Sequence, residues 1–271
     1  MALESIDLGR SGIKPLHVLH GKGLVLTGLA CNGFTNANYH LYCLDGEYLL
    51  RIPQHPARLA QTILDTQEEM KFTGFEEFGG TWRMRTPEEQ ANFSLKALSC
   101  GLSVIPLYYM GDQRLIMPYI EQAISLREHL LNGGLKIADA VLDHLRLAHK
   151  HNIVFGDRWT NNTLIAPDER IIEIDYDIAL NGPCAKEFEL AQFLFHVVHF
   201  SADRRRMIAL LENNFHSNPI RGDYDVDFIR LFMRNYVSHF GRIGQYEGLP
   251  VISHDEVASV LEVLGNQRDI T

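Results

Sequence analysis

The chain has 271 residues, of which 46% are hydrophobic and 22% charged, a balance that excludes a disordered or collagen-like protein. Its formal net charge is −9, from 25 Lys and Arg against 34 Asp and Glu, which argues against a dedicated nucleic-acid-binding protein. No basic start followed by an apolar run and no stretch of about 18 apolar residues occurs, so we expect neither a signal peptide nor a membrane span. The four cysteines lack zinc-ligand spacing, which favours reduced thiols in a cytoplasmic protein.

The first third of the chain predicts antiparallel strands. Apolar runs at residues 38–44 and 47–52 flank Asp45-Gly46, a dipeptide typical of a hairpin turn, and a shorter apolar run precedes them at residues 24–26. Residues 57–72 have mixed helical spacing. This part of the chain should therefore form a small sheet followed by a less regular segment.

A helix is expected from Thr86 to about Ser99. Thr86 is a good N-cap residue, Pro87 suits the first helical position, and Glu89 has the spacing that completes a capping box. The later elements are predicted in this order: an antiparallel pair at 104–109 and 115–120, helices at 125–131 and 137–149, a short strand at 153–155, a hairpin of 163–166 with 171–174, and helices between 186 and 264.

This order of elements predicts the fold class. Strands with one helix come first and helices come last, which argues for an α+β fold and against a doubly wound parallel sheet. We expect two lobes, a small lobe with an antiparallel sheet in residues 1–120 and a mainly helical lobe in residues 121–271. The hinge between them should lie near residues 118–124.

The segment 151–180 carries the clearest chemical signal. Asp157 follows an apolar strand, Asn162 comes five residues later, and Asp175 ends a second apolar strand beyond a tight hairpin. Carboxylate and amide oxygens are the ligands that hard divalent cations prefer, and Mg²⁺ in turn suits phosphates. Each residue alone could be an ordinary turn former, but their combined spacing indicates a site.

This segment resembles the catalytic loop of protein-kinase-like phosphotransferases, whose small-molecule branch has the pattern H-G-D-x-x-x-x-N. Phe155-Gly156-Asp157 with Asn162 matches that loop, and Asp175-Tyr176-Asp177 is similar to the metal-binding motif that follows it. The resemblance implies a bilobal protein-kinase-like fold and ATP with Mg²⁺ as the ligands. It also implies that Asp157 accepts the proton of the attacking hydroxyl and that Asn162 and Asp175 hold Mg²⁺.

Two positions of this segment depart from the protein-kinase pattern. Phe155 replaces the histidine, and Asp177 replaces the glycine that protein kinases have. An acid at position 177 is similar to the aminoglycoside and choline kinase branch. Glu187 and Glu189 lie where that branch has an acid that braces the catalytic loop or meets a cationic substrate, although an ordinary helix start explains them equally well. The histidines show no metal-binding spacing, so we expect His196 and His199 to be core or surface residues.

The resemblance extends upstream to the nucleotide-binding residues. Residues 32–39 are similar to the phosphate loop of choline and thiamine kinase-like proteins, so Gly33, Thr35 and Asn36 would approach phosphate, although a simple hairpin turn also fits. Arg51 ends a Leu-Arg-Ile strand at the place of the family's phosphate-binding lysine. Its guanidinium would contact the α- and β-phosphates with a different geometry from lysine.

The remaining cofactor contacts are implied by position. Glu89 is the first candidate for the acid that pairs with Arg51, and the alternatives are Glu88, Glu69 and Glu68. Residues 115–121 resemble the strand leading to the interlobe linker, where adenine would bind backbone groups. Pro118 has no N–H, so Tyr119 or Ile120 would be the donor.

The implied function is transfer of the γ-phosphoryl group of Mg-ATP to a hydroxyl of a small-molecule acceptor such as choline, thiamine, an aminoglycoside or a sugar. Two alternatives remain open: a protein or sugar kinase of the Rio or lipopolysaccharide-kinase type, and a nucleotide-binding pseudokinase that acts as a scaffold. The sequence identifies neither the acceptor nor the oligomeric state.

Overall fold

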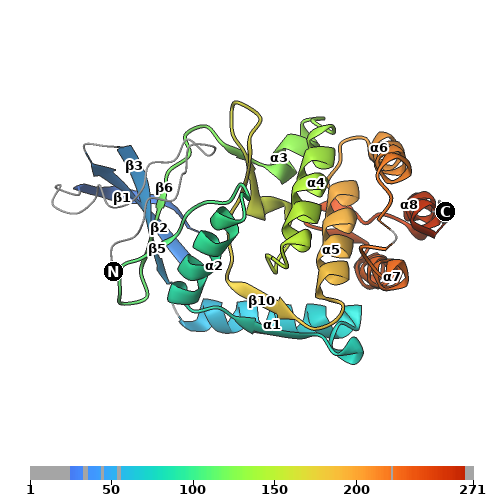
Figure 1. The fold of residues 1–271 in the computed structure, drawn as a ribbon, viewed down its shortest axis with the longest axis horizontal. Helices are drawn as coiled ribbons and strands as arrows, with labels where there is room; N and C mark the ends of the chain where they lie inside the picture. The colour runs from blue at the N-terminus through green and yellow to red at the C-terminus, as the bar shows by residue number, and fades with distance from the viewer. Residues whose placement is uncertain (1–24, 33–35, 44–45, 54–55, 221, 266–271) are drawn as a thin grey trace.

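The computed structural model describes residues 25–32, 36–43, 46–53, 56–220 and 222–265 (Figure 1). An antiparallel five-stranded sheet forms one end of the molecule, in the order β1-β2-β3-β6-β5. Its strands are β1 (Val25–Asn32), β2 (Asn36–Cys43), β3 (Gly46–Pro53), β5 (Tyr108–Tyr109) and β6 (Leu115–Pro118). The register of β2 on β3 places Asn38 opposite Arg51. These two side chains therefore project from the same face of the sheet.

Helix α1 (Pro56–Thr73) leaves this sheet and packs on α7 (Val226–Ile243) at the other end of the molecule. In the view of Figure 1 it runs along the lower edge of the molecule, below the label of β10 (Ile178–Asn181). Strand β4 (Thr81–Met84) follows and pairs antiparallel with β10. Two segments from the first 120 residues, α1 and β4, thus pack on C-terminal elements. The boundary between the two lobes at residue 120 therefore stays a prediction.

Helix α2 (Pro87–Ser99) has the predicted capping box. The Glu89 backbone N–H donates to Thr86 Oγ1 at 3.2 Å, and the Thr86 N–H donates to the Glu89 carboxylate at 2.8 Å. Two of the backbone donors that a helix start leaves unpaired are satisfied in this way. The predicted helix bounds are confirmed.

The middle of the chain forms the junction between the sheet and the helices. The chain passes from β6 to β7 (Ile124–Ser125), and β7 adds to a hairpin of β8 (Thr163–Ile165) and β9 (Ile171–Glu173) in the order β7-β8-β9. Helices α3 (Leu126–Leu131) and α4 (Ile137–Lys150) lie between β7 and β8 in sequence. The catalytic-loop motif therefore connects α4 to the junction sheet.

The rest of the chain is mainly helical. It contains α5 (Ala185–His199), α6 (Arg204–Ser217), α7, a two-stranded pair of β11 (Gln245–Tyr246) with β12 (Leu249–Pro250), and α8 (His254–Gly265). Nearly every residue of α5 is buried, and this helix packs on α4, α6 and α7. A helix buried on all sides is a rigid support, and polar residues on it must find partners. The predicted α+β fold with a sheet-containing part and a helical part is confirmed.

One predicted strand is wrong. Residues 153–155 pair with no strand within the described part of the chain. Instead, the Arg85 side chain donates to the carbonyl oxygens of Val154, at 3.3 Å, and Phe155, at 3.0 Å. Ile153 and Phe155 are buried, but a guanidinium takes the place of a neighbouring strand.

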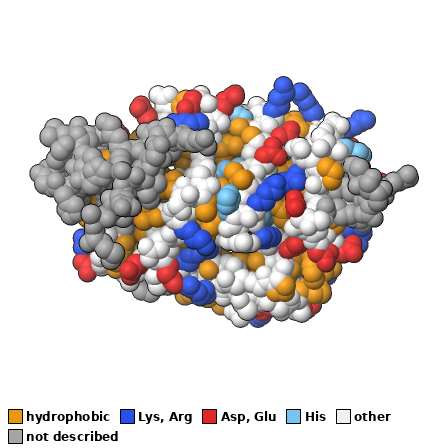
Figure 2. Space-filling model, in the orientation of Figure 1, with side chains coloured by type: hydrophobic (Ala, Val, Ile, Leu, Met, Phe, Trp, Pro, Cys, Tyr) orange, Lys and Arg blue, Asp and Glu red, His pale blue; other side chains and the backbone are white. Residues whose placement is uncertain are grey.

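No helix among the residues that the structure describes has the length and apolar character needed to cross a membrane. On the face shown in Figure 2, acidic and basic side chains are interspersed. Cys100 and Cys184 are free thiols.

Candidate active site

The loop carrying Asp157 is held in place by two polar residues of the buried helix α5. The Gly156 N–H donates to Glu189 Oε1 at 2.8 Å, and the Arg158 N–H donates to Gln192 Oε1 at 2.5 Å. Glu189 also contacts His149 Nε2 at 2.7 Å. The backbone on both sides of Asp157 is therefore anchored to the core, and of the two roles considered for Glu189 the structure shows the brace.

Gly156 is required by the path of this loop. Its φ is +116°, which side chains other than glycine rarely adopt, and a Cβ there would lie 1.9 Å from the carbonyl oxygen of Ile178. The close approach brings the catalytic loop against β10. It also places Asp157 beside the Asp175-Tyr176-Asp177 motif.

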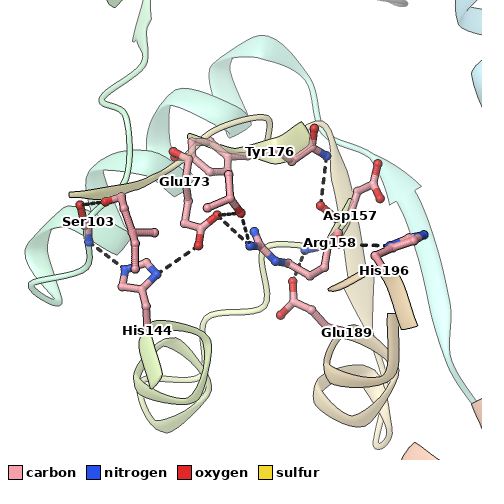
Figure 3. A network of polar contacts seen from close by, with 12 residues as sticks. Ser103, His144, Asp157, Arg158, Glu173, Tyr176, Glu189 and His196 are labelled. Atoms are coloured by element: carbon pink, nitrogen blue, oxygen red, sulfur yellow. Dashed lines mark hydrogen bonds and ion pairs between the residues drawn. The ribbon is translucent and has the colours of Figure 1, made fainter. Parts of the chain in front are cut away.

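A buried ion pair ties the same loop to the junction sheet (Figure 3). Arg158 contacts Glu173 Oε2 at 2.8 Å, and their side chains are 1% and 0% exposed. Thr163 Oγ1 accepts from Arg158 at 2.7 Å and lies 2.8 Å from the same Glu173 oxygen. The Ser103 N–H donates to His144 Nε2, so His144 Nδ1 carries the proton that it donates to Glu173 Oε1 at 3.2 Å.

This network keeps Glu173 ionised. Burial alone would raise the pKa of Glu173, but the charge of Arg158, followed by His144 and Thr163, holds it below the usual value. An ionised and fully buried carboxylate needs these partners. Tyr176 adds to the network, because its hydroxyl donates to the Glu173 carbonyl and accepts from the Ile105 N–H.

Asp157 and Asn162 lie together at the two ends of one short loop. Asn162 Nδ2 donates to the Asp157 carbonyl oxygen at 3.1 Å, which leaves its amide oxygen for another partner. Gln192 Nε2 approaches Asp157 Oδ1 at 3.4 Å. Burial raises the pKa of Asp157 well above its usual value, and the neighbouring carboxylates Glu69, Asp177 and Asp175 raise it further.

The second motif brings its two acids to the same place. Asp175 has a left-handed backbone, with φ +64°, and Arg51 donates to its Oδ1 at 2.9 Å. Burial, together with the charge of Asp175, raises the pKa of Asp177 to about 7, against the opposing effects of Arg51 and Arg85. Arg51 therefore reaches across from the sheet to the motif that follows β9.

Arg85 is a residue that the sequence did not single out. Besides the two carbonyls of residues 154 and 155, its guanidinium donates to the carbonyl oxygens of Tyr176 at 3.0 Å and Ile178 at 2.5 Å. It stacks on Phe93 at 4.1 Å, and burial lowers its pKa to about 10. A single side chain thus fixes the backbone of both the catalytic loop and the Asp-Tyr-Asp motif.

A cavity of about 800 Å³ is lined by candidate residues from both the sheet and the helical part. Strands β2 and β3 and the two motifs line it through Asn36, Asn38, Arg51, Asn162, Asp175 and Asp177. Helices α1 and α7 and strand β11 also line it, through residues that include Glu69, Phe72, Phe240 and Tyr246, and so does Trp159 of the loop that carries Asp157. Asp157 also lines the cavity.

Two expected contacts differ in the structure. Glu89 pairs with Arg83, at 2.7 and 2.8 Å, on the outside of α2, because it completes the helix cap there, and Arg51 pairs with Asp175 instead. The Tyr119 N–H donates to the Glu47 carbonyl at 3.0 Å and is not free for adenine. Ile120 stays the predicted donor. Gly33 and Thr35 lie outside the described residues.

The residues present fit magnesium and a phosphate. Asn162 and Asp175 offer oxygen atoms to one cavity, and few protein ligands are normal for Mg²⁺, which binds substrate phosphates as well. Within the described ranges, no group of three His, Cys, Asp or Glu side chains could by itself hold a metal ion. Arg51 Nε is buried without a hydrogen-bond partner, an unsatisfied donor suited to a phosphate oxygen.

No family model and no curated protein matches the chain. Among solved structures, it is similar to the PknI kinase domain of Mycobacterium tuberculosis, at 15% identity over 79% of this chain and 96% of that one, with a TM-score of 0.45. A double mutant of that domain matches at 16% identity over 87% of this chain and 99% of that one, with a TM-score of 0.43.

The chain has a bilobal protein-kinase-like fold. The arrangement that defines it is an antiparallel sheet, a linker, a helical part, and a catalytic loop and hairpin at their junction.

Proposed function

We propose that the chain is an ATP-dependent phosphotransferase that moves the γ-phosphoryl group of Mg-ATP to a hydroxyl group of a small molecule. The observation that carries this proposal is the meeting of Asp157, Asn162, Asp175 and Arg51 in one cavity at the junction of the sheet and the helices. These residues come from three separate segments of the chain.

The chain's own groups divide the work. Arg51 binds phosphate oxygens, and Asn162 and Asp175 would hold Mg²⁺, which supplies positive charge against the phosphates. The acceptor oxygen forms a bond to the γ-phosphorus while the bond from that phosphorus to the bridging oxygen breaks, so ADP leaves with the electron pair. Asp157 takes the hydroxyl proton. The anchors from Glu189, Gln192 and Arg85 hold these groups in position, which is most of what such a reaction requires.

The shape of the cavity favours a small acceptor over a protein. Helix α1 lines the cavity from Thr62 to Phe72 and so occupies space that an extended polypeptide would need as an open groove. Most of the charged side chains that line this cavity are acidic, and Arg51 is the basic residue among them. The acidic residues are Asp65, Glu68, Glu69, Asp157, Asp175, Asp177 and Glu247. This charge suits the cationic alcohols expected from the sequence and does not exclude a sugar.

Substitution of the two acids tests the proposal. Asp157→Asn should lower ADP release by about 10²–10⁴-fold, the usual contribution of a general base, and Asp175→Asn should abolish it, each with an unchanged melting curve. Asp168→Asn, at an exposed turn, is the matched control and should behave as wild type. Turnover at the wild-type rate in Asp157→Asn would contradict the assignment.

A nucleotide-binding protein without transfer is a second candidate. Phe155 replaces the family's histidine, and the Arg51–Asp175 ion pair engages one of the two proposed metal ligands. Binding of Mg-ATP in calorimetry, without release of ADP in the presence of any acceptor, would support this candidate.

A further inference from the structure

Helix α1 delivers an additional carboxylate, Glu69, to the cavity beside Asp157. Its Oε1 accepts hydrogen bonds from the Tyr236 hydroxyl and from Gln192 Nε2, the latter at 2.7 Å. Across the part of the chain that the structure describes, Glu69 Oε2 receives no hydrogen bond. Glu69 is therefore held firmly by one oxygen and keeps the other for a partner.

Gln192 fixes the spacing between Glu69 and Asp157. Its amide oxygen accepts from the Arg158 N–H at 2.5 Å, so its Nε2 must face the two carboxylates. Since that nitrogen lies 2.7 Å from Glu69 Oε1 and 3.4 Å from Asp157 Oδ1, the two oxygens are no more than about 6 Å apart. One small molecule can therefore contact both side chains.

Two stacked aromatic pairs belong to the same cavity. Phe72 stacks on His239 with ring centroids 3.7 Å apart, and Phe240 stacks on Tyr246 at 3.9 Å. All four side chains line the cavity. Their faces suit the carbon skeleton of a compact ligand, whose polar groups would then point to the carboxylates.

We infer that Glu69 determines acceptor specificity by binding a second hydrogen-bond donor of the acceptor, an ammonium or a hydroxyl group, next to the hydroxyl that faces Asp157. The acceptor class is an alcohol with a vicinal donor, which is a 1,2-amino alcohol or a 1,2-diol unit. This inference rests on the proposed phosphotransfer. Burial raises the pKa of Glu69, against the Tyr236 and Gln192 hydrogen bonds, which is in keeping with a carboxylate that lacks one partner.

Three matched alcohols test the inference in wild-type protein with Mg-ATP: ethanol, ethane-1,2-diol and 2-aminoethanol. They differ by one group, so ADP release isolates the contribution of the second donor. We expect kcat/KM at least about tenfold higher for the diol or the amino alcohol than for ethanol, as a hydrogen bond to a charged group implies. The better of the two identifies hydroxyl or ammonium as the group that Glu69 binds.

Glu69→Gln should remove this preference by raising KM for the better alcohol about tenfold, while KM for ATP stays unchanged. The variant keeps an oxygen for Tyr236 and Gln192, and a thermal melt checks its fold. Glu77→Gln, an exposed acid that does not line the cavity, is the control and should keep the preference. If Glu69→Gln does not fold, the comparison of the three alcohols with wild-type protein still tests whether the acceptor needs a second hydrogen-bond donor.

The outcomes separate this inference from the proposed function. Equal rates with the three alcohols, or Mg-ATP binding with no stimulation by the diol or the amino alcohol at saturation, would overturn the role of Glu69 and leave nucleotide binding intact. Failure of the wild-type protein to bind Mg-ATP at all would instead count against the proposed function.

Discussion

The buried ion pair between Arg158 and Glu173 should be the interaction on which the catalytic loop depends most. Replacing Arg158 with Met leaves the Glu173 charge fully buried and without its guanidinium partner. Breaking one side of such a pair costs about 3–5 kcal/mol, whereas complete removal of the pair is often neutral. We therefore expect Arg158→Met to lower the free energy of unfolding by about 3–5 kcal/mol, a large part of the 5–15 kcal/mol typical of a domain.

The double variant Arg158→Met with Glu173→Gln should recover much of this loss. It removes the charge that has lost its partner, and the glutamine amide would still offer an oxygen to His144 or Thr163. A coupling free energy of at least about 1 kcal/mol between the two positions is expected. The two partners must therefore be measured singly and together.

Urea unfolding at pH 7, followed by circular dichroism, measures all four proteins of the cycle. Arg170→Met is the control, because Arg170 pairs with Asp168 at an exposed turn, and it should unfold close to wild type. A loss below about 1 kcal/mol for Arg158→Met, or a double variant no more stable than the single one, would refute the reasoning.

Three further predictions follow from the geometry. Gly156→Ala should lose both stability and ADP release, because its Cβ would lie 1.9 Å from the Ile178 carbonyl oxygen; wild-type melting would contradict this. Burial lowers the pKa of His196 to about 3 from 6.5, so its stabilising contribution is present above pH 6.5 and is lost as pH falls. Between pH 7 and pH 5, the free energy of unfolding measured in urea titrations should therefore fall by about 2 kcal/mol less for His196→Phe than for the wild-type protein. Glu89→Gln should weaken the α2 cap and the contact with Arg83 but leave KM for ATP unchanged. A raised KM for ATP would instead show that Glu89 contributes to nucleotide binding.

The sequence predicted the features that neighbouring residues determine. The capping box at Thr86 and Glu89 occurs as expected, since it needs only four consecutive residues. The hairpin of β2 and β3 likewise follows from alternating apolar residues around a turn. The catalytic segment was found because Asp157 and Asn162 are separated by a fixed short loop.

Long-range partners could not be read from local patterns. Glu89 was expected to reach Arg51, but its own helix cap and Arg83 engage it first, while Arg51 finds Asp175, 124 residues away. Nothing in the local pattern singled out Arg85. Only the fold shows that buried carbonyl groups surround it.

Helix α1 is a further case in which tertiary structure decides the role. The mixed helical spacing of residues 57–72 led us to expect a less regular segment, whereas the structure has one continuous helix of 18 residues. The spacing also gave no indication of what this segment packs against. The packing on α7 turns Glu69 toward Asp157, and the intermediary is Gln192 of α5, more than a hundred residues later. No pattern in a single sequence identifies such a residue, because α1, α5 and α7 meet only after folding.

The most direct test of the account follows the γ-phosphoryl group itself. Wild-type protein and Asp157→Asn are each mixed with γ-labelled ATP, Mg²⁺ and a protein-free metabolite extract, and the labelled products are separated. We expect the label to move from ATP into a small organic molecule with the wild-type protein and to remain in ATP with Asp157→Asn. Label found only in inorganic phosphate, or equal transfer by both proteins, would contradict the claim that this cavity phosphorylates a small molecule through Asp157.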